Sequence, residues 1–196
     1  DPPRNEEGTV YDYVAGGLAE IGEQLKIYHD LLDLIATDPS EKNLNRLTRV
    51  QEQLDHANAW RFEDRIQNVL AALKLDGHTK LTDLSGGWQR KAALARALVR
   101  DPDVLLLDEP TNGLDIPSKA QIQKFIAAEA NDERFFLIST HLVNDIKNLA
   151  DSVAIIDNGK IIVNSPLEKI AQKIQCNFLP YLYDRYHHHF YQQQWL

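Results

Sequence analysis

The 196-residue sequence predicts an α/β fold that carries an antiparallel helical hairpin at its N-terminal end. Apolar residues repeat with a period of 3.5 in the first third of the chain, which is typical of helices packed along their length. Beyond residue 100, short apolar runs alternate with helical segments, as in a buried parallel sheet flanked by helices. The chain is 43% hydrophobic. This fraction excludes disordered and collagen-like classes.

The hairpin is predicted over residues 11–60. The apolar seam of its first helix consists of Val14, Leu18, Ile21, Leu25, Tyr28, Leu32 and Ile35. The seam of the second helix consists of Leu44, Leu47, Val50, Leu54 and Ala57. Between them, Asp38 is expected to cap the second helix, Pro39 suits its first position, and Glu41 completes a capping box. Each helix would span about 30 Å.

Three basic residues of the second helix, Lys42, Arg46 and Arg49, lie at i, i+4 and i+7. This spacing places them on one face near the tip of the hairpin. The net charge of the chain is −8, with most of the acidic excess in the first 60 residues. Broad electrostatic attachment to nucleic acid is therefore not expected. The basic stripe has two interpretations, a solvated face or a contact with a phosphate backbone.

Residues 61–176 are expected to form the α/β part. Helices are predicted around Ile66–Leu73, at 116–130 and at 142–150. Strands are predicted at Val104–Leu107, Phe135–Ser139, Val153–Ile156 and Ile161–Val163. The last two flank Asn158-Gly159, a strong signal for a two-residue β-hairpin turn.

A helix start is predicted at Ser85-Gly86-Gly87. Glycines ahead of a helix let a ligand approach the backbone, and free N–H groups together with the helix dipole favour an anion there. Ser85 adds a hydroxyl donor. The same three residues are also compatible with an ordinary loop and cap.

Two adjacent carboxylates, Asp108 and Glu109, end the first apolar strand. In phosphoryl transfer, one such carboxylate serves a phosphate-bound Mg²⁺ and the other polarises the attacking water. We expect Asp108 to serve the metal and Glu109 the water. His141 follows the next strand, where it is placed to hydrogen-bond a terminal phosphate oxygen.

The segments LSGGW, LLLDEPTNGLD and STH, in this order, resemble the signature, Walker B, D-loop and switch-histidine motifs of the ATP-binding cassette (ABC) superfamily. The resemblance implies a partial P-loop NTPase of ABC type that uses ATP and Mg²⁺ and pairs with a second cassette. It implies that the signature residues contact ATP held on the opposing cassette, and that the remaining motifs serve the ATP of their own domain. The signature residues are Ser85, Gly86 and Gly87; Asp108 is the Mg²⁺ residue, Glu109 and His141 are catalytic, and Asp115 is the D-loop acid.

Trp88 and the preceding hairpin are similar to the ABC-F branch, whose members are ATPases without membrane domains that act on the ribosome. The resemblance implies a cytoplasmic translation factor whose hairpin meets ribosomal RNA and tRNA, a role suited to Lys42, Arg46 and Arg49. From Gly113 onward the sequence is more similar to the ATPase subunit of a membrane transporter, which is the alternative. A third interpretation is a non-catalytic fragment that acts as an interaction module.

Two absences concern the nucleotide site. The sequence contains no methionine and no G-x-x-x-x-G-K-[ST], the Walker A loop that holds phosphates. Family order would place that loop before Asp1, so residues 1–10 are interpreted as a loop entering from an upstream segment, and the chain alone is expected to be inactive. The single Cys176 and the lack of a signal-like start favour a reducing compartment. The tail at 177–196 has no assigned role. Its histidines, at 187–189, suit either a metal or a surface tract.

Overall fold

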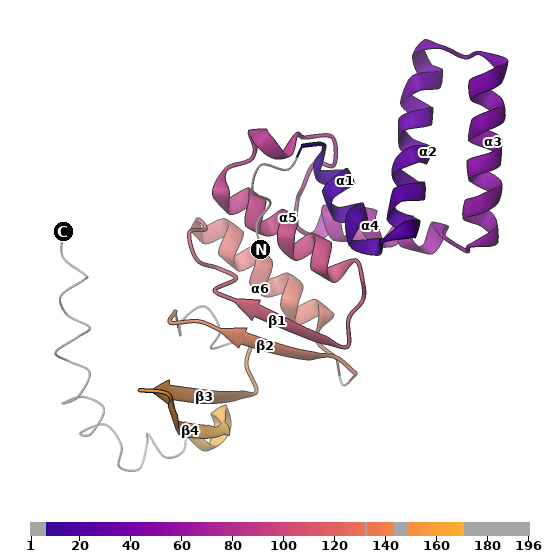
Figure 1. Ribbon diagram of the computed structural model, residues 1–196. Helices are drawn as coiled ribbons and strands as arrows, with labels where there is room; N and C mark the ends of the chain where they lie inside the picture. The colour runs from indigo at the N-terminus through magenta and orange to yellow at the C-terminus, as the bar shows by residue number, and fades with distance from the viewer. Residues whose placement is uncertain (1–6, 132, 143–148, 171–196) are drawn as a thin grey trace. The chain divides into compact units, whose positions relative to one another are not determined.

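The computed structural model describes residues 7–131, 133–142 and 149–170. The chain divides into two compact units, Asp1–Asp145 and Ile146–Leu196, and each is described by itself. The first unit contains helices α1–α6 and a parallel pair of strands, and the second contains a β-hairpin followed by helical residues at 167–170 (Figure 1).

The first predicted helix is interrupted. Helix α1 spans Val10–Ala15, a 3₁₀ turn spans Gly16–Leu18, and α2 spans Glu20–Thr37. Ala19 separates them with a φ of 53°, in the left-handed region that ends a helix. The expectation of one continuous seam from Val14 is therefore wrong. The two glycines of the 3₁₀ turn have low helix propensity, and the chain changes direction there.

Helices α2 and α3 form the antiparallel hairpin (Figure 1), with α3 spanning Glu41–His56. The helix begins after Ser40, so the expected Asp38 cap with Pro39 in the first turn is wrong. The Asp38 N–H closes the end of α2 by donating to Leu34 O at 2.7 Å. Its carboxylate and carbonyl accept from the buried Asn43 amide at 3.0 and 3.1 Å. Asp38 thus ends one helix and cannot cap the next.

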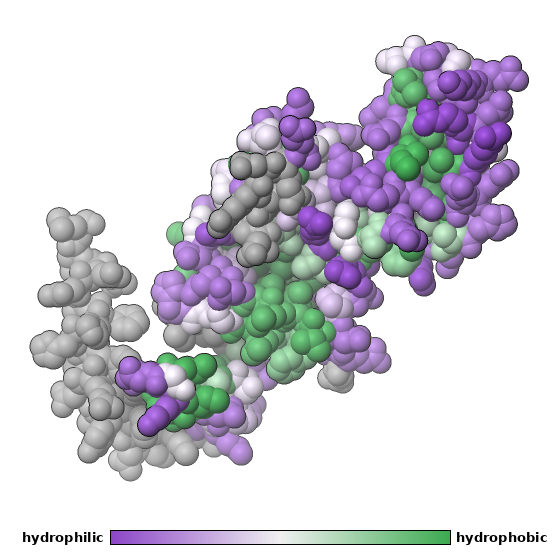
Figure 2. Space-filling view, in the orientation of Figure 1, coloured by the Kyte–Doolittle hydropathy of each residue, from purple (hydrophilic) through white to green (hydrophobic). Residues whose placement is uncertain are grey.

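The hairpin is packed most densely near its base. Leu25 of α2 and Leu54 of α3 are fully buried, whereas Leu34 and Leu44 near the turn are exposed. Figure 2 shows a hairpin surface that is mostly hydrophilic, with apolar patches between the helices. Apolar burial stabilises in proportion to the area removed from water, so the base contributes more than the tip.

Helix α4 spans Trp60–Ala72 and holds the base of the hairpin. Glu63 of α4 accepts a hydrogen bond from the Tyr11 hydroxyl, and its Oε1 lies 3.3 Å from His29 Nε2. Tyr28 meets Trp60 edge to face at 5.2 Å between ring centroids. These contacts connect α1, α2 and α4.

Gly22 allows the closest approach at this base. A Cβ built on Gly22 would lie 1.9 Å from the carbonyl oxygen of Ala15. No side chain fits there unless α1 and α2 separate.

Strands β1, Val104–Asp108, and β2, Phe135–Ser139, pair in parallel with Val104 opposite Phe135 and Asp108 opposite Ser139. Helices α5, Gly86–Leu98, and α6, Ile116–Glu129, lie on the same side of this pair in Figure 1. The predicted strand positions and parallel direction are confirmed.

The expectation of a fully buried sheet is corrected, because β1 alternates. Leu105 and Leu107 are buried, whereas alternate residues are exposed. The exposed apolar side chains are Val104, Leu106, Phe135 and Leu137, at 65, 67, 59 and 52%. The strand register pairs them across the two strands, and Figure 2 shows apolar surface in this region. Among the described residues, helices cover one face of the pair only.

A network of charged side chains joins α4, α6 and the start of β2. The carboxylate of Glu129 accepts from Arg65 at 3.1 Å and from Arg134. Asp101 pairs with the same two arginines, at 2.9 Å from Arg65. Arg65 also donates to the carbonyl of Leu98 at the end of α5. The network ties the helices to the loop that enters β1.

In the second unit, β3, Ser152–Asp157, and β4, Lys160–Pro166, form the predicted antiparallel hairpin, with Asp157 opposite Lys160. The helix predicted at 142–150 falls largely outside the described residues, as do Cys176 and the tail. None of the helices in the described part of the chain is both long and apolar enough to cross a membrane.

Candidate functional site

The carboxyl ends of β1 and β2 bring the first group of predicted site residues together. Because the strands are parallel and Asp108 is opposite Ser139, the residues that follow each strand emerge at the same edge. The Glu109 N–H donates to Ser139 O at 2.8 Å. Glu109 then takes a φ of 47°, which turns the chain out of the strand. Glu109 and His141 thereby face each other.

The Glu109 carboxylate is held at both oxygens. His141 Nδ1 lies 2.6 Å from Oε1, and the His141 backbone N–H donates to the same oxygen at 3.0 Å. The Thr140 hydroxyl donates to Oε2 at 3.1 Å. The hydrogen bond with the His141 side chain holds the pKa of Glu109 below its ordinary value, against the opposing effect of burial. Glu109 is therefore ionised at neutral pH and fixed in orientation.

Asp108 lies beside this pair with an exposed side chain and accepts a hydrogen bond from the Ser139 hydroxyl. An ionised carboxylate is a hard oxygen ligand of the kind Mg²⁺ prefers. Within the described residues there is no cluster of three or more histidine, cysteine or acidic side chains suited to a metal. This donor set fits Mg²⁺ held by one carboxylate together with phosphate oxygens, rather than by an all-protein cage.

The second group of predicted residues lies at the start of α5. Ser85 is the N-cap residue, with φ −64° and ψ 159°, and its side chain makes no capping bond. The Gln89 N–H donates to Ser85 O at 2.9 Å, so the helix begins there. The amides of Gly86, Gly87 and Trp88 precede Gln89 N–H, the first intrahelical donor, and are free for an anion.

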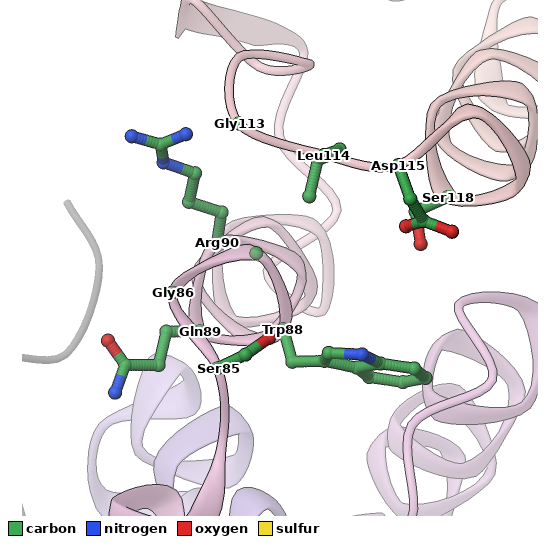
Figure 3. A pocket seen from close by; sticks show the side chains of 10 residues that line it. Ser85, Gly86, Trp88, Gln89, Arg90, Gly113, Leu114, Asp115 and Ser118 are labelled. Atoms are coloured by element: carbon green, nitrogen blue, oxygen red, sulfur yellow. The ribbon is translucent and has the colours of Figure 1, made fainter.

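These residues line an open pocket of about 600 Å³ that also contains the D-loop. Its lining residues are Ser85, Gly86, Gly87, Trp88, Gln89, Arg90, Gly113, Leu114, Asp115 and Ser118. Figure 3 shows the Leu114 side chain directed toward the first turn of α5. The signature and D-loop residues therefore form one surface.

Arg90 and Gly113 shape this surface. The Arg90 guanidinium donates to the carbonyl of Asn112. Gly113 has a φ of 71°, and a Cβ there would lie 2.6 Å from Arg90 Nη1. A side chain at Gly113 would be strained and would press on Arg90. Asp115 is the N-cap residue of α6, and its carbonyl accepts from Lys119 N at 2.9 Å.

The predicted residues thus form two separate groups and one remote face. Asp108, Glu109 and His141 meet at the strand ends, and none of them lines the signature pocket. Lys42, Arg46 and Arg49 are exposed on α3. The residues that sequence reasoning missed are Ser139 and Thr140, which orient the carboxylates, and Arg90, which holds the D-loop. Their roles depend on pairing between distant segments, so no local signal marked them.

Parallel strands that end in two carboxylates and a histidine, with a glycine-led helix start nearby in sequence, define an α/β nucleotide-binding domain. Residues 6–112 match the family model described as "ABC transporter". The chain belongs to the ABC transporter ATP-binding family. Members of this family bind ATP, generally with Mg²⁺.

Two relatives show which members of this family the chain resembles. The chain is 53% identical to the ATP-binding protein Uup of Escherichia coli (strain K12) over 162 residues, which cover 83% of this chain and 25% of Uup. It is 33% identical to the energy-dependent translational throttle protein EttA of Mycobacterium tuberculosis (strain ATCC 25618 / H37Rv) over 180 residues, 89% of this chain and 32% of EttA. Uup and EttA are ABC-F family members. The chain spans about a quarter to a third of these relatives.

Solved structures agree on the fold. An ATP-binding subunit of an ABC transporter superposes with a TM-score of 0.61 at 19% identity, covering 93% of this chain and 64% of that one. A nucleotide-free ATP-binding cassette from an ABC transporter gives 0.57 at 22% identity, covering 90% and 63%. The predicted ABC-type α/β fold is confirmed.

Proposed function

We propose that this chain is the arm, signature and Walker B portion of a cytoplasmic ABC-F ATPase that hydrolyses ATP between two paired cassettes and acts on the ribosome. The observation that carries the ATPase proposal is the Glu109 carboxylate, held by His141 and Thr140 at the end of β1. An ionised, oriented carboxylate at this position is what a water-polarising residue requires.

Glu109 retains the capacity to polarise water. A carboxylate oxygen offers about two acceptor positions. Oε2, which accepts from Thr140 at 3.1 Å, can accept from a water as well. His141 keeps Oε1 engaged through two bonds, so the carboxylate cannot rotate freely. Asp108 would hold Mg²⁺ through its exposed carboxylate, and the ion would neutralise charge on the phosphates.

The separation of the two groups supports a site shared between cassettes. Ser85, Gly86 and Gly87 present free amides in a pocket that contains neither Glu109 nor Asp108. They would therefore complete the ATP site of a second cassette, with the positive end of α5 directed at the γ-phosphate. The second cassette belongs either to the same polypeptide or to another copy.

The experiment is Glu109→Gln in the full-length protein. The amide keeps the shape of the side chain but is a much weaker base, so ATP hydrolysis should fall by about 10²-fold or more while ATP binding persists. Glu133→Gln, a change of an exposed acid that contacts neither group, is the matched control. Equal turnover by Glu109→Gln and wild type would refute the mechanism.

The ribosomal part of the proposal rests on α3 and on the relatives. Lys42, Arg46 and Arg49 form an exposed basic stripe on the hairpin. EttA, to which 89% of this chain aligns, is named an energy-dependent translational throttle protein. A basic stripe on a projecting hairpin suits a phosphate backbone, with ribosomal RNA or tRNA as the ligand.

Sedimentation of the full-length protein with ribosomes tests this part. Replacement of Lys42, Arg46 and Arg49 by glutamate should weaken ribosome binding. It should also make the plot of log binding constant against log salt concentration less steep, by the release of up to about three counterions. Reversal of Lys80, Lys124 and Lys160, exposed bases elsewhere, should have little effect. Equal loss in both triple variants would show that net charge, and not the stripe, governs binding.

A second candidate function is the ATPase subunit of a membrane transporter. The observation that favours it is 37% identity over 99 residues to the ABC transporter ATP-binding protein NatA of Bacillus subtilis (strain 168). Affinity purification from detergent-solubilised cells separates the candidates. An integral membrane partner would support the transporter, and ribosomal proteins would support the first proposal.

A further inference from the structure

Lys91 is buried inside the first unit, close to the signature residues. Its residue surface is 2% exposed, although lysine is seldom buried without a partner. It lies in α5 one turn after Trp88, and its ammonium nitrogen is 4.2 Å from the centroid of the Trp88 ring. Figure 3 shows this ring extending from the signature helix.

The second contact of Lys91 is with α6. Its Nζ donates to Gln121 Oε1 at 3.0 Å. Gln121 in turn donates through Nε2 to the carbonyl of Ala72 at 2.8 Å. Ala72 is the last residue of α4, so this exposed carbonyl has no donor within the helix, and Gln121 supplies one. One glutamine therefore connects the end of α4 to Lys91.

The other end of α4 contacts the hairpin. Glu63, in its first turn, bonds Tyr11 and His29, and Trp60 packs on Tyr28. Helix α4 is about 20 Å long, so one continuous hydrogen-bonded segment connects the two sets of contacts. A displacement of the hairpin base would thus move the Ala72 carbonyl.

We propose that Lys91 and Gln121 are positioning residues that fix Trp88 and the signature turn relative to the last turn of α4. They hold Ser85, Gly86 and Gly87 in place for the nucleotide of the opposing cassette, and they make this position depend on the hairpin. The inference rests on the proposed ATPase function. Neither residue lines the signature pocket.

The chemical properties of Lys91 and Gln121 explain why these two residue types suit the positioning role. Burial lowers the pKa of Lys91, and the nearby Lys74 lowers it further, whereas the Asp115 carboxylate opposes the shift. A buried ammonium is costly unless it is paired or hydrogen-bonded, so Lys91 depends on its contacts with Trp88 and Gln121. The amide of Gln121 accepts from Lys91 through its oxygen and donates to Ala72 through its nitrogen, a combination that a carboxylate in the same place cannot provide.

The experiment measures steady-state ATP hydrolysis by the full-length protein against ATP concentration. Lys91→Met keeps the volume but removes the ammonium, and should raise the apparent KM for ATP about fivefold with kcat changed less than twofold. Lys91→Arg, which can stack on Trp88 and donate to Gln121, should restore the wild-type KM. Lys124→Met, on the exposed side of α6, is the matched control.

Gln121→Glu tests whether the bond from Gln121 to Ala72 matters in addition to the contact between Lys91 and Gln121. A glutamate still accepts from Lys91 but cannot donate to Ala72, so it should raise KM as Lys91→Met does. Hydrogen exchange of the amides at 85–91, measured without nucleotide, provides a readout independent of activity. Exchange should be faster in Lys91→Met and Gln121→Glu than in wild type, and unchanged in Lys124→Met.

The outcomes distinguish this inference from the proposed function. If Lys91→Met and Gln121→Glu match Lys124→Met in KM and in exchange, the positioning role is refuted while ATP hydrolysis by the wild type stands. If Lys91→Met does not fold, Gln121→Glu decides in the same way, because it is expected to raise KM and speed exchange by breaking the bond to Ala72. Absence of hydrolysis by the wild type would overturn both.

Discussion

His141 lies with its Nδ1 2.6 Å from Glu109 Oε1, although the two residues are 32 positions apart in the chain. The parallel register of β1 and β2 brings them together. The contact lowers the pKa of the carboxylate, which stays ionised, and fixes its orientation, which Glu109 needs if it polarises water.

Replacement of His141 by alanine should raise the pKa of Glu109 toward its ordinary value of 4.5, because the hydrogen bond with His141 is the largest cause of the lowering. The pair favours the folded site above pH 4.5, and this contribution is lost as the pH falls through the lowered pKa. Titration of the side-chain carboxyl by ¹³C NMR measures the shift. An unchanged pKa in His141→Ala, with His78→Ala as the control, would contradict the geometry.

The base of the hairpin should respond to pH through His29 and Glu63. The hydrogen bond with Glu63 raises the pKa of His29, against burial, and the charges of Glu63, Asp33 and Asp12 add to the increase. Burial alone would raise the pKa of Glu63, but hydrogen bonds from His29, Tyr11 and Gln67 outweigh it and lower the value. The pair is therefore mutually stabilising when both groups are charged.

The sign of each contribution sets a pH window. The His29 contribution is complete below pH 6.5 and is lost as the pH rises through the raised pKa. The Glu63 contribution is present above pH 4.5 and is lost as the pH falls through its lowered pKa. His29→Gln should flatten the alkaline side of the curve of Tm against pH, whereas His56→Gln on the exposed end of α3 should not. Parallel curves for wild type and His29→Gln would exclude this coupling.

Gly22→Ala should separate α2 from α1. The new Cβ would lie 1.9 Å from the Ala15 carbonyl oxygen, a backbone atom that cannot move aside. We expect a loss of about 1–3 kcal/mol in the free energy of unfolding, as for other overpacked sites. Chemical denaturation of this variant and of Asp30→Ala, an exposed site on α2, gives the comparison. A Gly22→Ala protein as stable as wild type would disprove the close approach.

Glu129→Gln tests the charged network that joins α4 and α6. Its carboxylate serves both Arg65 and Arg134, which are partly buried, so the substitution leaves two guanidinium groups with a weaker acceptor. The free energy of unfolding should fall by about 1–3 kcal/mol. The exposed Glu133→Gln should change it by less than about 0.5 kcal/mol. A double-mutant cycle with Arg134→Met should show non-additivity, and strict additivity would mean that the two side chains do not interact.

Much of the site was predictable because its signals are local. The strand of β1, its two terminal acids and the glycine-led start of α5 each lie within a few consecutive residues, and the structure places all of them at the ends of the expected elements. The Asn158-Gly159 turn was predictable for the same reason, since few residues adopt its backbone conformation.

Errors arose where two elements compete for one residue. Aspartate is a common helix cap, but Asp38 makes other bonds here: its N–H donates to Leu34 O at the end of α2, and its carboxylate accepts from the Asn43 amide. The seam from Val14 has the right period, but the chain turns at Ala19, and tertiary packing of α2 on α1 overrides the pattern.

The sequence by itself determined the class of fold and the motif residues, because these depend on residue type and short spacing. The division between signature and Walker B roles is what the resemblance to the ABC family implies. Only the tertiary structure decided that His141 and Thr140 hold Glu109, that Glu63 ties down the hairpin, and that Lys91 reaches α4 through Gln121. Hydrogen bonds act over about 3 Å, and side chains far apart in the sequence come within that distance only when the chain is folded.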